Sequence, residues 1–405
     1  MVTASDQSIP QVAATSERRL LELSVVIPTY KERANIAPLL TALKAGLQGL
    51  NWEVIFVDDH SPDHTADAVR ELALVNPRVR IIERIGRRGL SSACIEGMMA
   101  SPAPCLAVMD ADMQHDETVL PEMFRLLQSR NLDVVVASRR ITGGSMGEFA
   151  KKRVRLSDLG SRVSKLVCHC EVTDPMSGFF IVDSHFFRAS VPRLTGTGFK
   201  ILVDILASSP APPRLAEVPY RFRNRVAGES KLDVNVELEY LFLIVDKLVG
   251  RYLPTRFVLF LGVGSLGLLI HLSILGMFHI LAPAAFAAGQ AVATLSAMMF
   301  NFFLNNLVTF RDRRLKGMAL LRGLFVFYAA CTLGVLINLS FADRLLAAGL
   351  PWYFAGICGV AISSVWNYGV NTIVTWRRAR GSMGEVANPP LRHRELFRRT
   401  IPERP

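Results

Sequence analysis

Four long apolar stretches in the C-terminal part of the chain restrict its fold more than any other feature. They run over residues 257–281, 284–309, 318–342 and 352–376. A bilayer crossing requires roughly 20 consecutive, mostly apolar residues, and each stretch is longer than that. Because lipid offers no hydrogen-bond partners to the backbone, such segments cross it as α-helices. We therefore expect a four-helix transmembrane domain over residues 256–380, embedded in a lipid bilayer.

Basic residues are concentrated on one side of this expected bundle. They are Arg311, Arg313, Arg314 and Lys316 between the second and third stretches, and Arg377, Arg378 and Arg380 after the fourth. The opposite side has only Arg344. The positive-inside rule therefore predicts that the N-terminal half, the middle loop and the basic tail, residues 381–405, lie in the cytoplasm.

The net charge of the whole chain is +11 and its sequence pI is near 9.6, which suits an anionic partner. Positive-inside topology explains most of this excess, and no RNA- or DNA-binding motif is present, so we expect no nucleic-acid partner. Residues 1–22 are polar and lack the apolar core of a signal peptide. We expect them to be a disordered leader.

The first half of the chain alternates short β-branched runs with helical patterns. The runs cover residues 23–28, 54–57, 79–82, 105–109 and 132–137. This rhythm predicts an α/β domain with a Rossmann-like, mostly parallel sheet covered on both faces. Ligands of such sheets bind beyond the carboxyl ends of the strands. The polar residues expected there are Tyr30, Glu32, Asp58, Asp59, Asp110 and Asp112.

Two carboxylates, Asp110 and Asp112, directly follow one of the buried runs. Their spacing lets both leave the strand end toward one site, and hard oxygen ligands of this kind suit Mg²⁺ or Mn²⁺ carrying a diphosphate. A D-x-D pair is common by itself, but its place after a buried strand favours a metal site. The sequence has neither a Walker-type phosphate loop nor a G-x-G-x-x-G string after the first run, which argues against an NTPase or a dehydrogenase.

Several strings, taken in order, carry a resemblance to a known family. Residues 25–32 (VVIPTYKE), 57–63 (VDDHSPD) and 110–114 (DADMQ) resemble the inverting family-2 glycosyltransferases of GT-A fold. Residues 223–232 (RNRVAGESKL), with Gly198-Phe199-Lys200 before them, are similar to the dolichol-phosphate mannose synthase branch. The resemblance covers residues 23–232. The chain departs from it at His60 and His64, where the family usually has glycine, and His60 could change the shape of the nucleotide pocket.

The resemblance implies a role for each matched position. The base and ribose of the sugar nucleotide would be held by Pro28, Tyr30, Glu32, Val57 and Asp59. Its diphosphate and sugar would meet Asp110, Ala111, Asp112, Gln114, Arg139, Arg225 and Lys231. The metal, Mg²⁺ or Mn²⁺, would be ligated by Asp112 and Gln114 together with Asp110. The arginines and the lysine suit phosphate oxygens, because Arg presents a planar fork and Lys a mobile point charge.

A basic segment, residues 151–155, leads into apolar residues that recur every three or four positions up to Val167. This pattern predicts an amphipathic basic helix. Two compatible interpretations remain open: a membrane-surface element that binds the phosphate of a lipid acceptor, or a domain helix that packs its apolar stripe on the sheet. In the first interpretation the acceptor phosphate would meet Arg139, Arg153 and Ser157.

The membrane half contains an internal repeat. Residues 301–311 (NFFLNNLVTFR) match residues 367–377 (NYGVNTIVTWR), which indicates two duplicated helical hairpins. This half is similar to GtrA-like four-helix modules that occur with polyprenyl-phosphate glycosyltransferases. Asn and His side chains within the spans are expected to face the bundle, as helix-to-helix contacts in preference to a transport path. Residues 233–255 are predicted to be an amphipathic linker at the membrane interface.

The sequence thus predicts transfer of mannose from GDP-mannose to a polyprenyl (dolichyl-type) phosphate, with inversion. The acceptor is already an anion, so no general base is nominated, and the residues expected to act in catalysis are Asp112, Arg139, Arg153, Arg225 and Lys231. Two alternatives stay open: a glucosyl- or N-acetylhexosaminyltransferase that uses a UDP-sugar, and a lipid-linked-sugar translocator whose soluble domain only binds nucleotide. A processive synthase is disfavoured, because no Q-x-x-R-W string is present.

Overall fold

The computed structural model describes residues 20–145, 167–168, 170–196, 198–223, 234–250 and 252–377. The chain divides into two compact units, which we treat separately. The α/β unit comprises residues 1–196 and 200–230, and the helical unit comprises residues 197–199 and 231–405. The domain bounds expected from the sequence, with the α/β domain ending at residue 232, stay a prediction.

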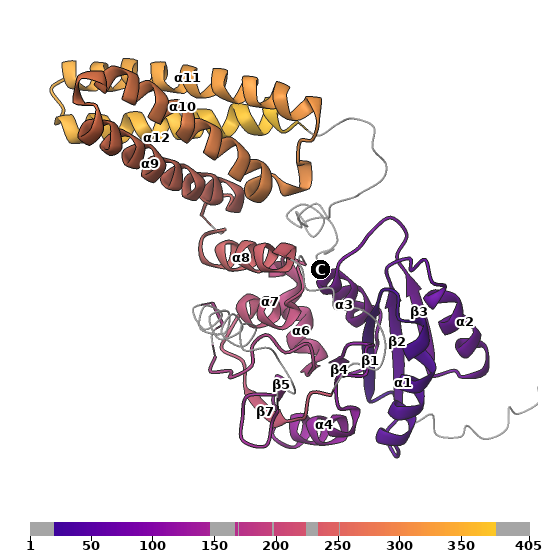
Figure 1. Ribbon diagram of the computed structural model, residues 1–405. Helices are drawn as coiled ribbons and strands as arrows, with labels where there is room; N and C mark the ends of the chain where they lie inside the picture. Colours follow the sequence, from indigo (N-terminus) through magenta and orange to yellow (C-terminus); the bar gives the residue numbers. More distant parts are fainter. Residues whose placement is uncertain are drawn as a thin grey trace, which may run out of the picture. The chain divides into compact units, whose positions relative to one another are not determined.

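The described part of the α/β unit contains a seven-stranded sheet with the order β3-β2-β1-β4-β6-β5-β7 (Figure 1). Its strands are β1 (Leu23–Thr29), β2 (Trp52–Asp58), β3 (Val79–Glu83), β4 (Cys105–Val108), β5 (Val134–Ser138), β6 (Phe180–Asp183) and β7 (Leu215–Pro219). Only β6 runs antiparallel to its neighbours among these strands. The predicted mostly parallel sheet is confirmed, and the five predicted runs correspond to β1 to β5.

Helices cover both faces of this sheet. Successive side chains of a strand point to opposite faces, so the continuous apolar runs give both faces an apolar surface for helices to pack on. The helices are α1 (Arg33–Gly46), α2 (Thr65–Val75), α3 (Leu90–Met99), α4 (Leu120–Ser129), α6 (Ser184–Ser190) and α7 (Ile201–Ser208), with short 3₁₀ turns at Glu117–Val119 and Val191–Arg193. On one face, Val25 and Ile27 join the core formed with α1 and α4. On the other face, Gly97 of α3 lies so close to the sheet that an added Cβ would stand 2.4 Å from Val26.

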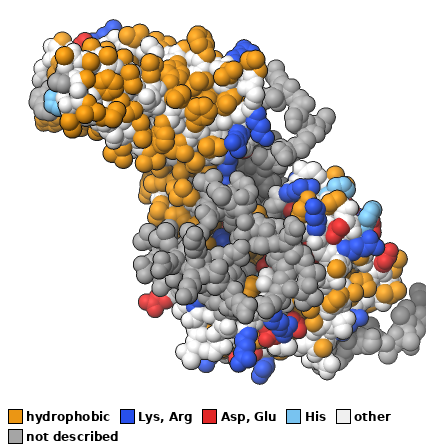
Figure 2. Space-filling view, viewed as in Figure 1, with side chains coloured by type: hydrophobic (Ala, Val, Ile, Leu, Met, Phe, Trp, Pro, Cys, Tyr) orange, Lys and Arg blue, Asp and Glu red, His pale blue; other side chains and the backbone are white. Residues whose placement is uncertain are grey.

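The helical unit contains one helix within the predicted linker, α8, and four helices, α9 to α12, that match the predicted spans. They are α8 (Val234–Val249), α9 (Thr255–Leu281), α10 (Phe286–Leu304), α11 (Met318–Ala347) and α12 (Trp352–Val370), with 3₁₀ turns at Pro283–Ala285 and Arg311–Arg313. Four segments of the described chain are long and apolar enough to cross a membrane: Thr255–Leu281, Ala287–Thr309, Met318–Ala347 and Tyr353–Thr375. Figure 2 shows hydrophobic side chains over most of the visible face of these helices.

The two hairpins of the helical unit repeat one another in detail, as the sequence predicts. α10 and α12 each pass into a π-helical turn, at Asn305–Thr309 and Asn371–Thr375. The equivalent residues Phe310 and Trp376, which follow these turns, stack with ring centroids 4.2 Å apart and an interplanar angle of 7°. This buried stack is one of the contacts that join the two halves of the repeat.

Polar side chains of the spans lie at helix crossings. A Cβ added to Gly267 of α9 would stand 2.1 Å from Oδ1 of Asn301 on α10, and one added to Gly334 of α11 would stand 2.3 Å from Oδ1 of Asn367 on α12. The equivalent pairs therefore let the helices of each hairpin approach closely. The predicted role of these asparagines as contacts between helices agrees with this packing. The interfacial location of α8 stays a prediction.

Candidate active site

The predicted nucleotide residues follow β1 and β2, whose register brings their carboxyl ends together. Thr29 pairs with Asp58 in the parallel β1–β2 ladder. The hydroxyl of Thr29 donates to Oδ1 of Asp58 (2.9 Å), and the Ser61 amide donates to Oδ2 (2.8 Å). Asp58 is therefore used to stabilise the turn after β2. The next carboxylate, Asp59, is the one that a ligand at this sheet edge could meet.

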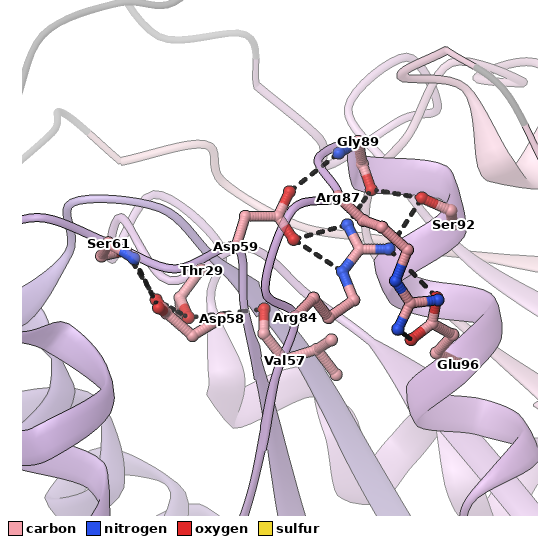
Figure 3. A network of polar contacts seen from close by, with 10 residues as sticks. All are labelled: Thr29, Val57, Asp58, Asp59, Ser61, Arg84, Arg87, Gly89, Ser92 and Glu96. Carbon is pink, nitrogen blue, oxygen red and sulfur yellow. Dashed lines mark hydrogen bonds and ion pairs between the residues drawn. The ribbon is translucent and has the colours of Figure 1, made fainter. Parts of the chain in front are cut away.

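Asp59 belongs to a buried polar network with the loop that follows β3 (Figure 3). Nε of Arg84 donates to its Oδ1 (2.7 Å), and the amide of Gly89 donates to its Oδ2 (2.8 Å). Arg84 has a fully buried side chain and also donates to the Gly89 carbonyl and the Ser92 hydroxyl, both at 2.8 Å. Burial raises the pKa of Asp59, although the Gly89 amide and Arg84 act in the opposite direction.

Within this network Asp59 still has capacity for a ligand. A carboxylate offers about four acceptor positions, and the bonds described here fill two on Oδ1 and one on Oδ2. The sequence predicted Asp59 as a base or ribose contact, and the remaining position on Oδ2 is compatible with a ribose hydroxyl. Arg84 was missed at the sequence level, because a single arginine after an edge strand carries no distinctive pattern.

The loop between β2 and α2 holds the loop after β1 in place. Ser61 accepts a hydrogen bond from the amide of Lys31 (2.9 Å), and Thr65 accepts one from the amide of Glu32 (3.1 Å). Glu32 in turn accepts from Nδ2 of Asn35 (2.8 Å). Tyr30 and Glu32, both predicted nucleotide contacts, are thus fixed beside the end of β2.

His60 and His64 adopt the backbone conformation that glycine favours. His60 has φ 51° and His64 has φ 62°, both in the left-handed region. Nδ1 of His60 is 2.6 Å from Oε1 of Glu83, and Nδ1 of His64 is 3.0 Å from Oδ2 of Asp67. These contacts hold both side chains at the surface, His60 being 62% exposed. The loop therefore keeps its turn, and the His60 side chain is drawn toward β3.

The carboxylates Asp110 and Asp112 follow β4, beside β1 in the sheet. Gln114 closes this turn: its amide donates to Oδ1 of Asp112 (3.1 Å), and its Nε2 donates to the carbonyl of Arg223 (3.1 Å). The bond from Nε2 fixes the orientation of the amide and leaves its Oε1 as the end that could ligate a cation. Burial and then the neighbouring charge of Asp112 raise the pKa of Asp110 above its usual range.

His115 stabilises this turn. The sequence did not indicate it as a site residue. Its Nδ1 accepts a hydrogen bond from the amide of Asp110 (3.0 Å), so a neutral ring carries its proton on Nε2, which lies 3.8 Å from Oδ2 of the same carboxylate. The ring is buried and stacks on Phe179 with centroids 5.1 Å apart. Burial lowers the pKa of His115 to about 4, so the ring is neutral at pH 7.

Arg139 follows β5, and its guanidinium is held by a carboxylate. Nε and Nη2 donate to the two oxygens of Asp174 at 2.7 Å and 2.9 Å, and the Asp174 side chain is fully buried. The predicted phosphate ligand therefore has a fixed orientation, with Nη1 as its remaining end. The sequence did not indicate the role of Asp174, because its partner lies 35 positions away.

Lys200, which the sequence singled out only as part of a family string, is close enough to Arg139, Asp110 and Asp174 for their charges to act on it. Burial lowers its pKa, and the charge of Arg139 acts in the same direction, while Asp110 and Asp174 act against it. A lysine and an arginine thus accompany the carboxylates after β4 and β5. This mixture of charges suits an anionic ligand bound together with a cation.

The residues after β4 fit a divalent cation. They supply two carboxylates and one amide oxygen, all hard ligands of the type that Mg²⁺ and Mn²⁺ prefer. No cluster of three or more His, Cys, Asp or Glu side chains with metal-binding geometry occurs within the residues that the structure describes. A cation held by so few protein ligands would need further oxygens from a substrate, as diphosphate sites usually provide.

Four predicted site residues lie outside the described residues: Arg153, Ser157, Arg225 and Lys231. The same holds for nearly all of the predicted basic helix, for most of the leader and for the basic tail. Among the described residues, the structure brings together the predicted site residues at the ends of β1, β2 and β4. Four supporting residues join them: Arg84, His115, Asp174 and Lys200.

Comparison with known proteins agrees with this architecture. Residues 24–189 match the family described as Glycosyl transferase family 2, and residues 259–376 match the GtrA/DPMS transmembrane domain. With the mostly parallel sheet and the four apolar spans, these matches define an integral membrane glycosyltransferase with a GT-A-like domain.

Relatives identify the family. The chain is 34% identical over 359 residues to the dolichol-phosphate mannosyltransferase of Pyrococcus furiosus, covering 88% of this chain and 99% of that one. It is 35% identical over 250 residues to the enzyme of the same name from Saccharomyces cerevisiae, covering 60% and 92%. The chain belongs to the dolichol-phosphate mannosyltransferase family.

Among solved structures, the chain is similar to glucosyl-3-phosphoglycerate synthase from Mycobacterium tuberculosis in complex with Mn²⁺, UDP and glucosyl-3-phosphoglycerate. The TM-score is 0.43 at 18% identity, and the match covers 60% of this chain and 86% of that one.

Proposed function

We propose that the protein transfers mannose from GDP-mannose to a polyprenyl phosphate of the dolichyl type, with inversion at C1 and with its α/β unit in the cytoplasm. One observation carries the proposal: the carboxylates after β4 share a sheet edge with the residues that follow β1 and β2. Kinship with dolichol-phosphate mannosyltransferases over nearly the whole chain supports the donor and the acceptor. The excess of basic residues on one side of the spans supports the orientation.

The donor would lie along this edge. Its base and ribose would meet Pro28, Tyr30, Glu32, Val57 and Asp59. Its diphosphate would reach Asp110, Ala111, Asp112 and Gln114. A Mg²⁺ or Mn²⁺ ion held by Asp112, Gln114 and Asp110 would supply Lewis-acid stabilisation of the departing diphosphate. The fixed turn around Gln114 and His115 would keep these ligands in place before substrate arrives.

Catalysis would consist mainly of bringing two anions together. The acceptor phosphate is ionised at neutral pH, so no side chain has to remove a proton from it. Arg139, fixed by Asp174, would orient phosphate oxygens through its remaining nitrogen, and Arg225 and Lys231 would offset charge on the donor. Arg153 and Ser157 would hold the acceptor phosphate for in-line attack on C1. A single displacement of this kind inverts the configuration.

The proposal can be tested with a panel of donors. The purified full-length protein would be given a short polyprenyl phosphate, Mg²⁺ or Mn²⁺, and GDP-mannose, UDP-glucose or UDP-N-acetylglucosamine. We expect lipid-linked product from GDP-mannose at a rate at least tenfold above that from the UDP-sugars. Preference for a UDP-sugar would replace the proposed donor. Absence of transfer from all three would contradict the proposed activity and favour a protein that only binds nucleotide.

A further inference from the structure

A short basic loop after β3 has no role in the proposed reaction. It comprises residues 85–88, between the buried Arg84 and Gly89, and contains two adjacent arginines, Arg87 and Arg88. The residues at both ends of the loop form hydrogen bonds with the end of β2, where predicted nucleotide-binding residues lie. The amide of Arg84 donates to the carbonyl of Asp58 (2.8 Å), and the amide of Gly89 donates to Oδ2 of Asp59 (2.8 Å).

The backbone of this loop requires glycine at its far end. Gly89 has φ 142°, which side-chain-bearing residues rarely adopt. Together with the fully buried Arg84 side chain, it fixes where the exposed part of the loop begins and ends. The loop is therefore held beside the end of β2 at two points only a few residues apart.

The two arginines of the loop have different partners. Arg87 forms a two-pronged ion pair with Glu96 on α3, at 2.7 Å and 3.1 Å, and is thereby turned toward the helix. The guanidinium of Arg88 instead lies over the ring of Tyr30, 4.6 Å from its centroid. Lys31 is also near this ring, at 5.6 Å. Arg88 thus reaches from the loop after β3 to a residue that follows β1.

The sheet order indicates which end of a bound nucleotide would meet this pair. Three strand spacings separate β3 from β4, which amounts to about 14 Å. A donor whose diphosphate lies at the carboxylates after β4 would extend along the edge toward β2 and β3. Its base, not its phosphates, would then lie near Tyr30 and Arg88. This step rests on the proposed function, since it assumes a nucleotide sugar at this edge.

We propose that Arg88 is a base-binding residue, whose guanidinium forms with Tyr30 a platform against which the donor base stacks. Guanidinium planes and aromatic rings both stack on nucleobases, and such contacts tolerate any base because every base has a π-face. Stacking on a single side chain typically contributes about 1–3 kcal/mol, which corresponds to about a 5- to 150-fold change in affinity. The network of Arg84 and Asp59 positions the loop, and Arg88 makes the contact.

The test is a binding experiment on the full-length protein in detergent. Affinities for GDP and GMP, and for UDP and UMP, would be measured for the wild type, Arg88→Ala, Arg88→Lys and Arg87→Ala. We expect Arg88→Ala to weaken the preferred diphosphate and its monophosphate by the same factor, about tenfold. Arg88→Lys should restore little, because it keeps the charge but lacks the plane. Arg87→Ala, the matched control in the same loop, should stay within twofold of the wild type.

Several results would overturn this assignment. If Arg88→Ala weakened the diphosphate but not the monophosphate, Arg88 would contact the outer phosphate. If Arg88→Ala matched the wild type, or if Arg87→Ala lost as much affinity, the stacking platform would be wrong. Preference of the wild type for UDP and UMP would refute GDP-mannose as the donor. The affinities of the Arg88 variants would then be compared for UDP and UMP, so that the role of Arg88 is tested independently of the donor. Binding of none of the four nucleotides would refute both proposals.

Discussion

The buried pair of Arg84 and Asp59 gives the most quantitative prediction about the α/β unit. In Arg84→Met the aliphatic stem keeps most of the volume, but the charge and the donors are lost. Asp59, whose side chain is only 10% exposed, would then be left without its counter-ion. Removing one partner of a buried ion pair typically destabilises by about 3–5 kcal/mol, because the other charge remains uncompensated. That is a large part of the stability of an ordinary domain.

Hydrogen exchange followed by mass spectrometry can measure this in the intact chain. The pair joins β2 to the loop before α3, so peptides covering Trp52–Asp58 and Leu90–Met99 report on it. A loss of about 3–5 kcal/mol corresponds to about 150- to 4,000-fold faster exchange of the protected amides, where exchange follows opening of this region. Arg87→Met is the control, since the Arg87–Glu96 pair is 46% and 30% exposed and should change exchange by less than about fivefold.

A double-mutant cycle separates the pair from its surroundings. Asp59→Asn keeps the shape of the side chain, and the double variant Asp59→Asn/Arg84→Met removes both charges. We expect the double variant to lose less than the sum of the single losses, by about 1–3 kcal/mol. Additive losses, or an Arg84→Met protein whose exchange equals that of Arg87→Met, would refute the reasoning that the pair acts as a unit.

Three further predictions concern the remaining parts of the molecule. Asp174→Asn should lower transfer about 10- to 100-fold because it releases Arg139, and unchanged transfer would show that this ion pair does not orient the phosphates. Gly267→Ala should lower the thermal unfolding temperature of the purified protein, because its Cβ would stand 2.1 Å from an asparagine oxygen. Gly262→Ala, the control, should leave this temperature unchanged, because nothing lies within 4 Å of the added Cβ. Asp112→Asn should reduce transfer more than 100-fold, and excess Mn²⁺ should not restore it; full activity would refute the metal assignment.

The sequence predicts most of the architecture because the relevant signals are local. Continuous apolar runs such as residues 54–57 favour buried strands, and apolar stretches longer than 20 residues favour membrane spans. The later strands β6 and β7 were not predicted. β7 (LAEVP) has no such run. β6 does have one, residues 179–182 (FFIV), but it enters the sheet antiparallel between β4 and β5. Such pairing depends on contacts distant in sequence.

The same limit applies to the candidate site. Residues that follow strand ends, such as Asp59 and Asp112, can be located from sequence because parallel strands bring their carboxyl ends to one edge. Their supporting residues cannot. Arg84, His115 and Asp174 act by holding a functional side chain in one orientation, and only the folded chain shows which side chain each one meets. The sequence signal for these residues is a burial pattern shared with many others.

The configuration of the product is the most direct test of the central claim. The full-length protein would be incubated with GDP-α-mannose, a short polyprenyl phosphate and Mn²⁺, and the lipid product would be examined by NMR. We expect a β-mannosyl phosphate, which requires the proposed donor, the lipid acceptor and a single displacement at C1. An α-linked product would contradict the single displacement, and the absence of any mannosyl lipid would contradict the assigned reaction.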